Sequence, residues 1–148
     1  MMETSGQLYQ DIVMDRVRNP RRAGRPEKFD AEAEGNNPLC GDRIHVYFDR
    51  DGSRISHESQ GCAIMIASAE LMADAVAGKN AAEIPQLRAE FEAVVSTGTE
   101  NPALGNLNAL ANLSEYRSRI RCATLPWSAL GDALGAHGPG TDEDRKYG

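Results

Sequence analysis

Three cysteines and one aspartate are the residues of this sequence best suited to chemistry. Cys40, Cys62 and Cys122 are separated by 22 and 60 positions, a spacing that matches no zinc finger or ribbon, whose paired cysteines lie close together in sequence. Asp42 follows Cys40 by two residues, and the intervening Gly41 lets the backbone bend so that both side chains converge. Because thiolates bind soft metals and act as nucleophiles, these residues are candidates for a metal or sulfur-transfer site.

The surroundings of the second and third cysteines favour the thiolate form. Cys62 follows a glycine at the expected start of a helix, where unpaired N–H groups and the helix dipole stabilise negative charge. We expect Cys122 to open the last helix beside Arg119 and Arg121, whose positive charge would lower the pKa of the thiol. A free cysteine is also often a small buried apolar residue, so for each cysteine taken singly both interpretations stay open.

The apolar periodicity predicts the elements that position these side chains, and their order is that of an α+β domain. Helices are predicted over residues 6–18, 62–77, 81–95, 101–113 and 121–134, the last interrupted by Pro126. Strands are predicted over residues 29–34, 43–49 and 54–60, with Asp51-Gly52 as the turn of a hairpin. The run Gly35-Asn36-Asn37-Pro38 is expected to break any regular element. The prediction is a small antiparallel three-stranded sheet packed against about five helices, as one domain over 1–134 with a disordered tail over 135–148.

Composition excludes several classes of function. The chain has 148 residues and a net charge of −6, an acidic balance that argues against nonspecific nucleic-acid binding and against anionic membrane surfaces. No run of eighteen apolar residues suits a membrane span, and the polar N-terminal stretch lacks the features of a secretory signal. Three cysteines cannot all pair internally, which favours a reducing compartment. We therefore expect a cytoplasmic protein.

Several segments together resemble the IscU/SufU family of iron–sulfur cluster assembly proteins, which is similar to the N-terminal part of NifU. Three segments of this chain resemble the signature regions of the IscU/SufU family. They are Asn37-Pro38-Leu39-Cys40-Gly41-Asp42, Gly61-Cys62-Ala63-Ile64 with Ala67-Ser68, and Arg119-Ile120-Arg121-Cys122-Ala123-Thr124-Leu125-Pro126-Trp127. The family's opening helix and following loop resemble Leu8-Tyr9 and Asn19-Pro20-Arg21. The resemblance covers about residues 8–134.

Two features indicate the SufU branch. IscU-type scaffolds carry a histidine directly before the third cysteine, where this chain has Arg121. The long segment before Cys122 and the placement of Arg119 three residues ahead of it also resemble SufU. One departure is Asp15-Arg16, where the family usually has Asp-His, but that position is not a ligand.

Resemblance to SufU implies a zinc-dependent sulfurtransferase. It implies one zinc ion held by Cys40, Asp42, Cys62 and Cys122, with Cys40 accepting persulfide sulfur from a SufS-type, pyridoxal-phosphate-dependent cysteine desulfurase. We expect Arg119 to offset the negative charge of the ligands. Downstream Suf assembly proteins are the further partners implied.

Two alternatives stay open. The same four residues could hold a [2Fe–2S] cluster transiently in an iron–sulfur scaffold, since thiolates serve both metals. A zinc-stabilised adaptor domain without chemistry is the second alternative, because closed four-ligand zinc sites are ordinarily structural. The absent histidine favours sulfur transfer over the scaffold. His45 and His57 are interpreted as sheet-face residues, and no nucleotide-binding fingerprint is present.

Overall fold

The computed structural model describes residues 5–51 and 54–135 and has the α+β architecture predicted from the sequence. The helices are α1 (Ser5–Arg18), α2 (Ala63–Val76), α3 (Ile84–Thr97) and α4 (Arg117–Ala133), with 3₁₀ segments η1 (Ala81–Glu83) and η2 (Pro102–Glu115). The strands are β1 (Ala31–Asn37), β2 (Asp42–Asp49) and β3 (Arg54–Gln60). Gly52 of the predicted hairpin turn, and the predicted tail from residue 136 onward, lie outside the described residues.

The expectation of about five helices becomes four α-helices and two 3₁₀ segments in the described part of the chain. The difference lies mainly in η2, where a helix was predicted. Gly105 has a φ of 55° and interrupts that segment, and the side chain of Asn108 accepts a hydrogen bond from Asn101 N at 2.8 Å. A positive φ is incompatible with a continuous α-helix. Within residues 5–51 and 54–135, no helix combines the length and apolar character needed to cross a membrane.

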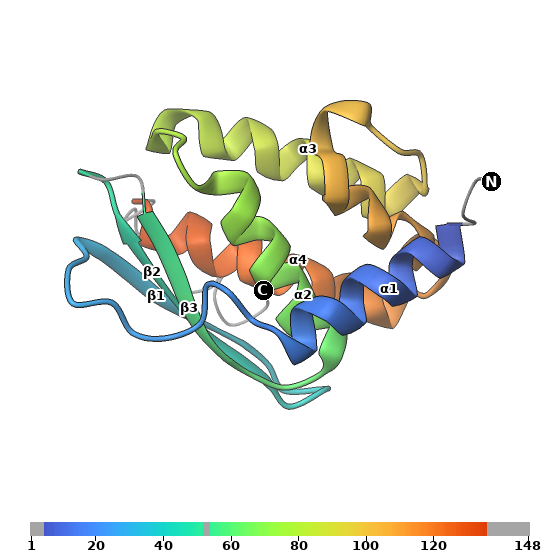
Figure 1. The fold of residues 1–148 in the computed structure, drawn as a ribbon, viewed down its shortest axis with the longest axis horizontal. Helices are drawn as coiled ribbons and strands as arrows, with labels where there is room; N and C mark the ends of the chain where they lie inside the picture. Colours follow the sequence, from blue (N-terminus) through green and yellow to red (C-terminus); the bar gives the residue numbers. More distant parts are fainter. Residues whose placement is uncertain (1–4, 52–53, 136–148) are drawn as a thin grey trace.

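The three strands form one antiparallel sheet in the order β1-β2-β3, with the helices on one side of it (Figure 1). Contrary to expectation, β1 continues through Gly35 to Asn37, and Gly35 pairs with Ile44 of β2. Helix α4 explains this glycine, because a Cβ there would lie 3.0 Å from Leu125 Cδ1 and 3.2 Å from Ala129 Cβ. Gly35 therefore permits close packing of helix on strand rather than ending the strand.

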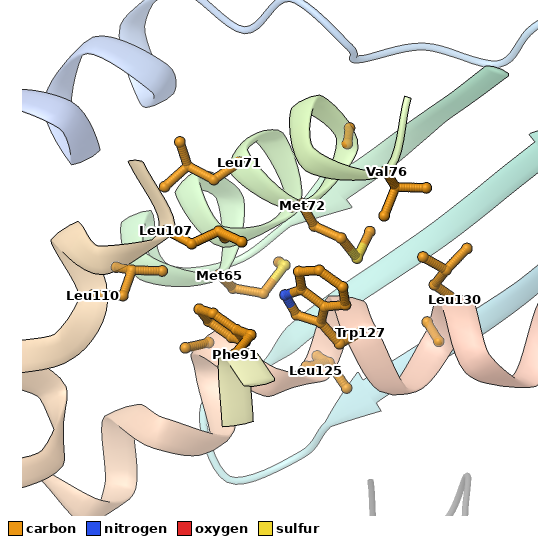
Figure 2. Close-up of a cluster of buried hydrophobic side chains, with 14 of the residues drawn as sticks. Met65, Leu71, Met72, Val76, Phe91, Leu107, Leu110, Leu125, Trp127 and Leu130 are labelled. Carbon is orange, nitrogen blue, oxygen red and sulfur yellow. The ribbon is translucent and has the colours of Figure 1, made fainter. Parts of the chain in front are cut away.

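The core lies between the sheet and the helices. Helix α4 packs on β1 and β2, and α2 packs on β3. Figure 2 shows Trp127 of α4 among apolar side chains of α2, α3 and η2, and its ring stacks on Phe91 with centroids 5.3 Å apart. Burying two such aromatic side chains contributes several kcal/mol, at about 25 cal/mol per Å² of apolar surface. The interpretation of Trp127 as a packing residue is confirmed.

The last helix begins earlier than predicted, at Arg117 rather than near residue 121. Its N-cap residue, Tyr116, makes no side-chain capping bond, so the sequence carries no start signal there. Pro126 lies inside the helix without ending it. Cys122 consequently lies in the second turn of α4, and the expectation that it opens this helix is wrong.

Candidate metal centre

The four predicted ligand residues come from four separate elements that meet at one end of the sheet. Cys40 lies in the turn between β1 and β2, Asp42 begins β2, Cys62 caps α2 and Cys122 lies in α4. The ligand atoms of Cys40, Asp42 and Cys122 lie within 4.8 Å of one another. The Sγ atoms of Cys40 and Cys122 are 3.8 Å apart, and Cys62 Sγ lies 3.5 Å from Asp42 Oδ2. The structure thus gathers three thiols and one carboxylate in one place.

Asp42 is held by the segment that leads into α2. Its side chain is fully buried, and its Oδ1 accepts a hydrogen bond from Cys62 N at 2.9 Å. Gly61 has a φ of 153°, and a Cβ at this position would lie 2.9 Å from Asp42 Cα and would clash with the carboxylate. Gly61 therefore lets β2 and the start of α2 approach closely enough for the carboxylate to reach the thiols.

Cys62 is the N-cap residue of α2, as predicted. Its Sγ accepts a hydrogen bond from Met65 N at 3.4 Å, which satisfies one of the unpaired N–H groups of the first turn. The sulfur therefore lies at the N-terminal end of α2, beside the N–H groups of its first turn.

Cys122 has the opposite environment. Burial, followed by hydrogen bonds to Asp42 and Cys62 and their negative charges, raises the pKa of the Cys122 thiol well above its ordinary value. The expectation that Arg119 and Arg121 lower this pKa is wrong for the metal-free site, because Cys122 is fully buried whereas both arginines are exposed.

The donor set fits a divalent metal ion. Three sulfurs and one carboxylate oxygen match the ligand types and number that zinc prefers, and thiolates also suit iron–sulfur clusters. Asp42 is buried, and no ion pair between it and a Lys or Arg occurs in the described part of the chain. A buried acidic group without a basic partner is costly unless a cation binds it.

Accessibility separates the four residues. Cys40 is exposed, Cys62 is half-buried, and Asp42 and Cys122 are fully buried. Leu39, directly before Cys40, is 82% exposed, so an apolar side chain stands next to the accessible thiol. Leu39 was not predicted from the sequence to be a surface residue of the site, although it lies in the first signature segment, directly before Cys40. Cys40 is the thiol that a second protein can reach.

Arg119 lies close to the site without contacting it. Its side chain is exposed on the wall of a groove of about 720 Å³ that also includes Cys62, Met14 and Tyr116. Among the described residues no hydrogen bond or ion pair joins the guanidinium of Arg119 to Asp42 or to a cysteine. Tyr116 is 57% exposed on the same wall, a second apolar surface residue near the thiols.

Comparison with known proteins places these observations in a family. A model described as the NifU-like N terminal domain matches residues 8–123. The iron–sulfur cluster assembly scaffold protein IscU of Streptococcus pyogenes serotype M1 is 39% identical over 133 residues, which cover 86% of this chain and 82% of that protein. The zinc-dependent sulfurtransferase SufU of Bacillus subtilis (strain 168) is 34% identical over 128 residues, covering 83% and 86%. The FiSufU structure from the thermophilic Fervidobacterium islandicum AW-1 has a TM-score of 0.78 at 29% identity, covering 89% and 100%.

Proposed function

Since this chain belongs to the family of NifU-like N terminal domains and is a relative of IscU and SufU proteins, we propose that it is a zinc-dependent sulfurtransferase of iron–sulfur cluster assembly. The observation that carries the proposal is the convergence of Cys40, Asp42, Cys62 and Cys122, with Cys40 alone exposed. A buried anchor and one accessible thiol suit a site that must react with another protein.

Each residue has a role in this proposal. Cys40, Asp42, Cys62 and Cys122 would hold one zinc ion. Zinc, when bound, would keep the thiols deprotonated at neutral pH and offset their charge. Asp42, Cys62 and Cys122 fix the site from three elements of the core, whereas Cys40 lies on an exposed turn that a donor protein can reach.

The transfer itself is thiol exchange. The Cys40 thiolate attacks the terminal sulfur of a cysteine persulfide on the donor, the sulfur–sulfur bond of the donor breaks, and the donor cysteine leaves as a thiolate. Cys40 then carries the persulfide, and no external oxidant or reductant is needed. Arg119, exposed on the adjacent groove wall, is placed to meet negative charge on an approaching persulfide, which is the supporting role we assign to it.

The donor in this proposal is a SufS-type cysteine desulfurase that works with pyridoxal phosphate. Support comes from the relationship to the SufU of Bacillus subtilis, a zinc-dependent sulfurtransferase, and from Arg121 at the position where IscU-type scaffolds carry histidine. Three free thiols suit a reducing compartment, so we place the protein in the cytoplasm.

Desulfurase turnover tests the proposal. Purified zinc-loaded protein, mixed with a SufS-type desulfurase, cysteine and a thiol reductant that releases persulfide sulfur as sulfide, should raise alanine and sulfide production, and Cys40→Ser should abolish the increase. Thr97→Ala is a suitable control, because Thr97 is exposed at the end of α3, an element that carries none of the four ligand residues, and its hydroxyl donates to Ala93 O at 2.7 Å. Full stimulation by Cys40→Ser would overturn the proposal.

A scaffold for a [2Fe–2S] cluster is the second candidate. It is favoured by the 39% identity to a protein named as an iron–sulfur cluster assembly scaffold, and three thiols with a carboxylate also suit iron. The cluster would then be cargo rather than a resident cofactor. Reconstitution with iron and sulfide, followed by transfer to an apo-ferredoxin without any effect on a desulfurase, would favour this candidate.

An adaptor domain stabilised by zinc is the third reading. A purely structural site keeps four protein ligands on the metal and needs no accessible thiol, whereas Cys40 is exposed. Rapid alkylation of Cys40 in the folded, zinc-loaded protein would argue against this reading, and resistance of all three cysteines would support it.

A further inference from the structure

Two of the three thiols lie in van der Waals contact. The thiol of Cys122 donates a weak hydrogen bond to Cys40 Sγ across 3.8 Å, although the two residues are 82 positions apart in the chain. Cys40 lies in the turn between β1 and β2 and Cys122 lies in α4, so the contact joins the sheet to the last helix. The sulfurs of a disulfide lie about 2.05 Å apart, so an approach of about 1.8 Å would allow this bond.

The turn that carries Cys40 has room for this approach. Cys40 is exposed, and its neighbour Leu39 is 82% exposed, so the turn is not packed on its outer side. A Cβ at Gly41 would meet no atom within 4 Å, which shows open space on the other side of Cys40 as well. Cys122 is fully buried in a helix, so Cys40 is the residue that moves.

Accessibility gives the two thiols different roles in an oxidation. A small oxidant in solution reaches the exposed Cys40, whereas Cys122 is fully buried behind it. An accessible thiol that is oxidised to a sulfenic acid condenses with a thiol beside it. An exposed cysteine in contact with a protected one is the arrangement that is typical of redox-sensing cysteines.

The third thiol is held by other contacts. Cys62 Sγ accepts a hydrogen bond from Met65 N at 3.4 Å and lies 3.5 Å from Asp42 Oδ2. The group whose ligand atoms all lie within 4.8 Å of one another contains Cys40 and Cys122 but not Cys62. Cys62 also contacts Cys122, but Cys62 is half-buried and less open to an oxidant than Cys40. The geometry therefore selects Cys40 as the partner of Cys122.

We propose that hydrogen peroxide converts Cys40 and Cys122 of the metal-free protein into a reversible disulfide. The Cys40 sulfur attacks one oxygen of the peroxide, the oxygen–oxygen bond breaks, and Cys40 becomes a sulfenic acid as one water leaves. The Cys122 sulfur then attacks the Cys40 sulfur, the sulfur–oxygen bond breaks, and the hydroxyl leaves with the Cys122 thiol proton as a second water. The two thiols lose two electrons, which reduce the peroxide to two waters.

The bond would take two functions from the site at once. It occupies the one exposed thiol and removes two of the four candidate metal ligands. In a reducing compartment such a bond is transient, because a thiol reductant opens it again by thiol–disulfide exchange. The inference concerns the thiols of the metal-free protein and does not rest on the sulfur-transfer proposal.

Peptide mapping tests the inference on the unmodified sequence. Trypsin cleaves after Lys and Arg and so places the three cysteines in separate peptides, 29–43, 55–79 and 122–145. Protein kept in chelator is treated with hydrogen peroxide, alkylated without reductant and digested. The main product should be the linked pair of peptides 29–43 and 122–145, with Cys62 alkylated. Dithiothreitol should separate the pair, and a non-reducing gel should show a single chain.

Two serine variants distinguish the roles of the thiols. Cys122→Ser removes the condensing thiol, so Cys40 should persist as a sulfenic acid that dimedone traps on peptide 29–43. Cys62→Ser is the matched control, and it should form the same linked pair as the unmodified sequence. If Cys122→Ser does not fold, the peptide map and Cys62→Ser still decide the result.

Three results would overturn the inference. They are a main bond that includes Cys62, a bond between Cys40 residues of two chains, or oxidised Cys40 without any disulfide. Any of these, together with stimulation of the desulfurase by the zinc-loaded protein, would refute this inference alone. A bond between Cys40 and Cys122 in a protein that does not stimulate the desulfurase would confirm this inference and refute the sulfur-transfer proposal.

Discussion

Replacing Asp42 by asparagine should affect the metal-free and the zinc-loaded protein in different ways. Asp42 is fully buried, and its carboxylate contacts the N–H and Sγ of Cys62 and the thiol of Cys122, with no Lys or Arg paired to it in the described residues. Asparagine has nearly the same shape and keeps an oxygen that can accept the Cys62 N–H bond, but it has no charge. The substitution therefore isolates the electrostatic part of the contribution of Asp42.

The magnitudes follow from burial and from ligand number. Without metal, Asp42→Asn removes a buried acidic group and should leave the free energy of unfolding unchanged or raise it by up to about 2 kcal/mol. With zinc, the loss of a charged ligand should weaken affinity by about 100-fold or more. At a fixed zinc excess this removes about 2.7 kcal/mol of the stabilisation that zinc provides.

Chemical denaturation in chelator and in excess zinc measures both effects. Asp49→Asn is the control, because Asp49 lies at the other end of β2, is equally buried and pairs with Arg54 at 2.9 Å. It should destabilise the protein by about 1–3 kcal/mol whether or not zinc is present. A metal-free Asp42→Asn protein that loses more than about 2 kcal/mol, with an undiminished increment from zinc, would refute the reasoning. Asp42 would then be a structural partner of Cys62 and no metal ligand.

Three further predictions concern the surroundings of the site and the buried Glu70. Gly61→Ala should lower the free energy of unfolding by about 2–4 kcal/mol and reduce the bound zinc found by metal analysis, because the added Cβ displaces Asp42. Gly41→Ala is the control, since a Cβ at Gly41 meets no atom within 4 Å. It should cost only about 1–2 kcal/mol of backbone strain and leave the zinc content intact. Burial and negatively charged neighbours raise the pKa of Cys122, so zinc binding near neutral pH should release a proton from this thiol and become tighter as pH rises. Calorimetry in buffers of different ionisation enthalpy measures the number of protons released. A Cys122→Ala protein should release fewer protons on binding zinc. Burial favours the protonated form of Glu70, but hydrogen bonds from His57, Arg21 and Arg22 hold the pKa of Glu70 below its ordinary value. The stability that the charged carboxylate provides is therefore present above about pH 4.3 and is lost as pH falls below that value. Glu70→Gln should flatten this acid dependence in denaturation experiments, and an unchanged dependence would contradict the assignment.

The membership of the site could be predicted from the sequence, but its geometry could not. Cys40 and Asp42 are neighbours around a glycine, so their proximity is a local property of the chain. Cys122 reaches them from α4, which packs on β1 and β2 and crosses β1 closely at Gly35, so its position depends on tertiary packing. The sequence therefore indicated which residues to group, and the structure supplied the distances and the raised pKa of Cys122.

The errors in secondary structure have physical causes. A glycine that ends a strand and a glycine that lets a helix pack closely on a strand look alike in a sequence. The strand was therefore predicted to end at residue 34, whereas β1 continues through Gly35 to Asn37. Helix α4 lacks a capping side chain at Tyr116, so its start could not be located. The pairing of Glu70 with the loop 48 residues earlier at Arg22 is long-range and has no local signature.

The most direct test of the sulfur-transfer account is to locate the transferred sulfur. The zinc-loaded protein is incubated with a SufS-type desulfurase and cysteine, alkylated without reductant, digested and analysed by mass spectrometry. The account predicts one additional sulfur on the peptide that contains Cys40, with Cys62 and Cys122 unmodified. A persulfide on Cys62 or Cys122 that persists in Cys40→Ser, or no persulfide on any of the three, would contradict it.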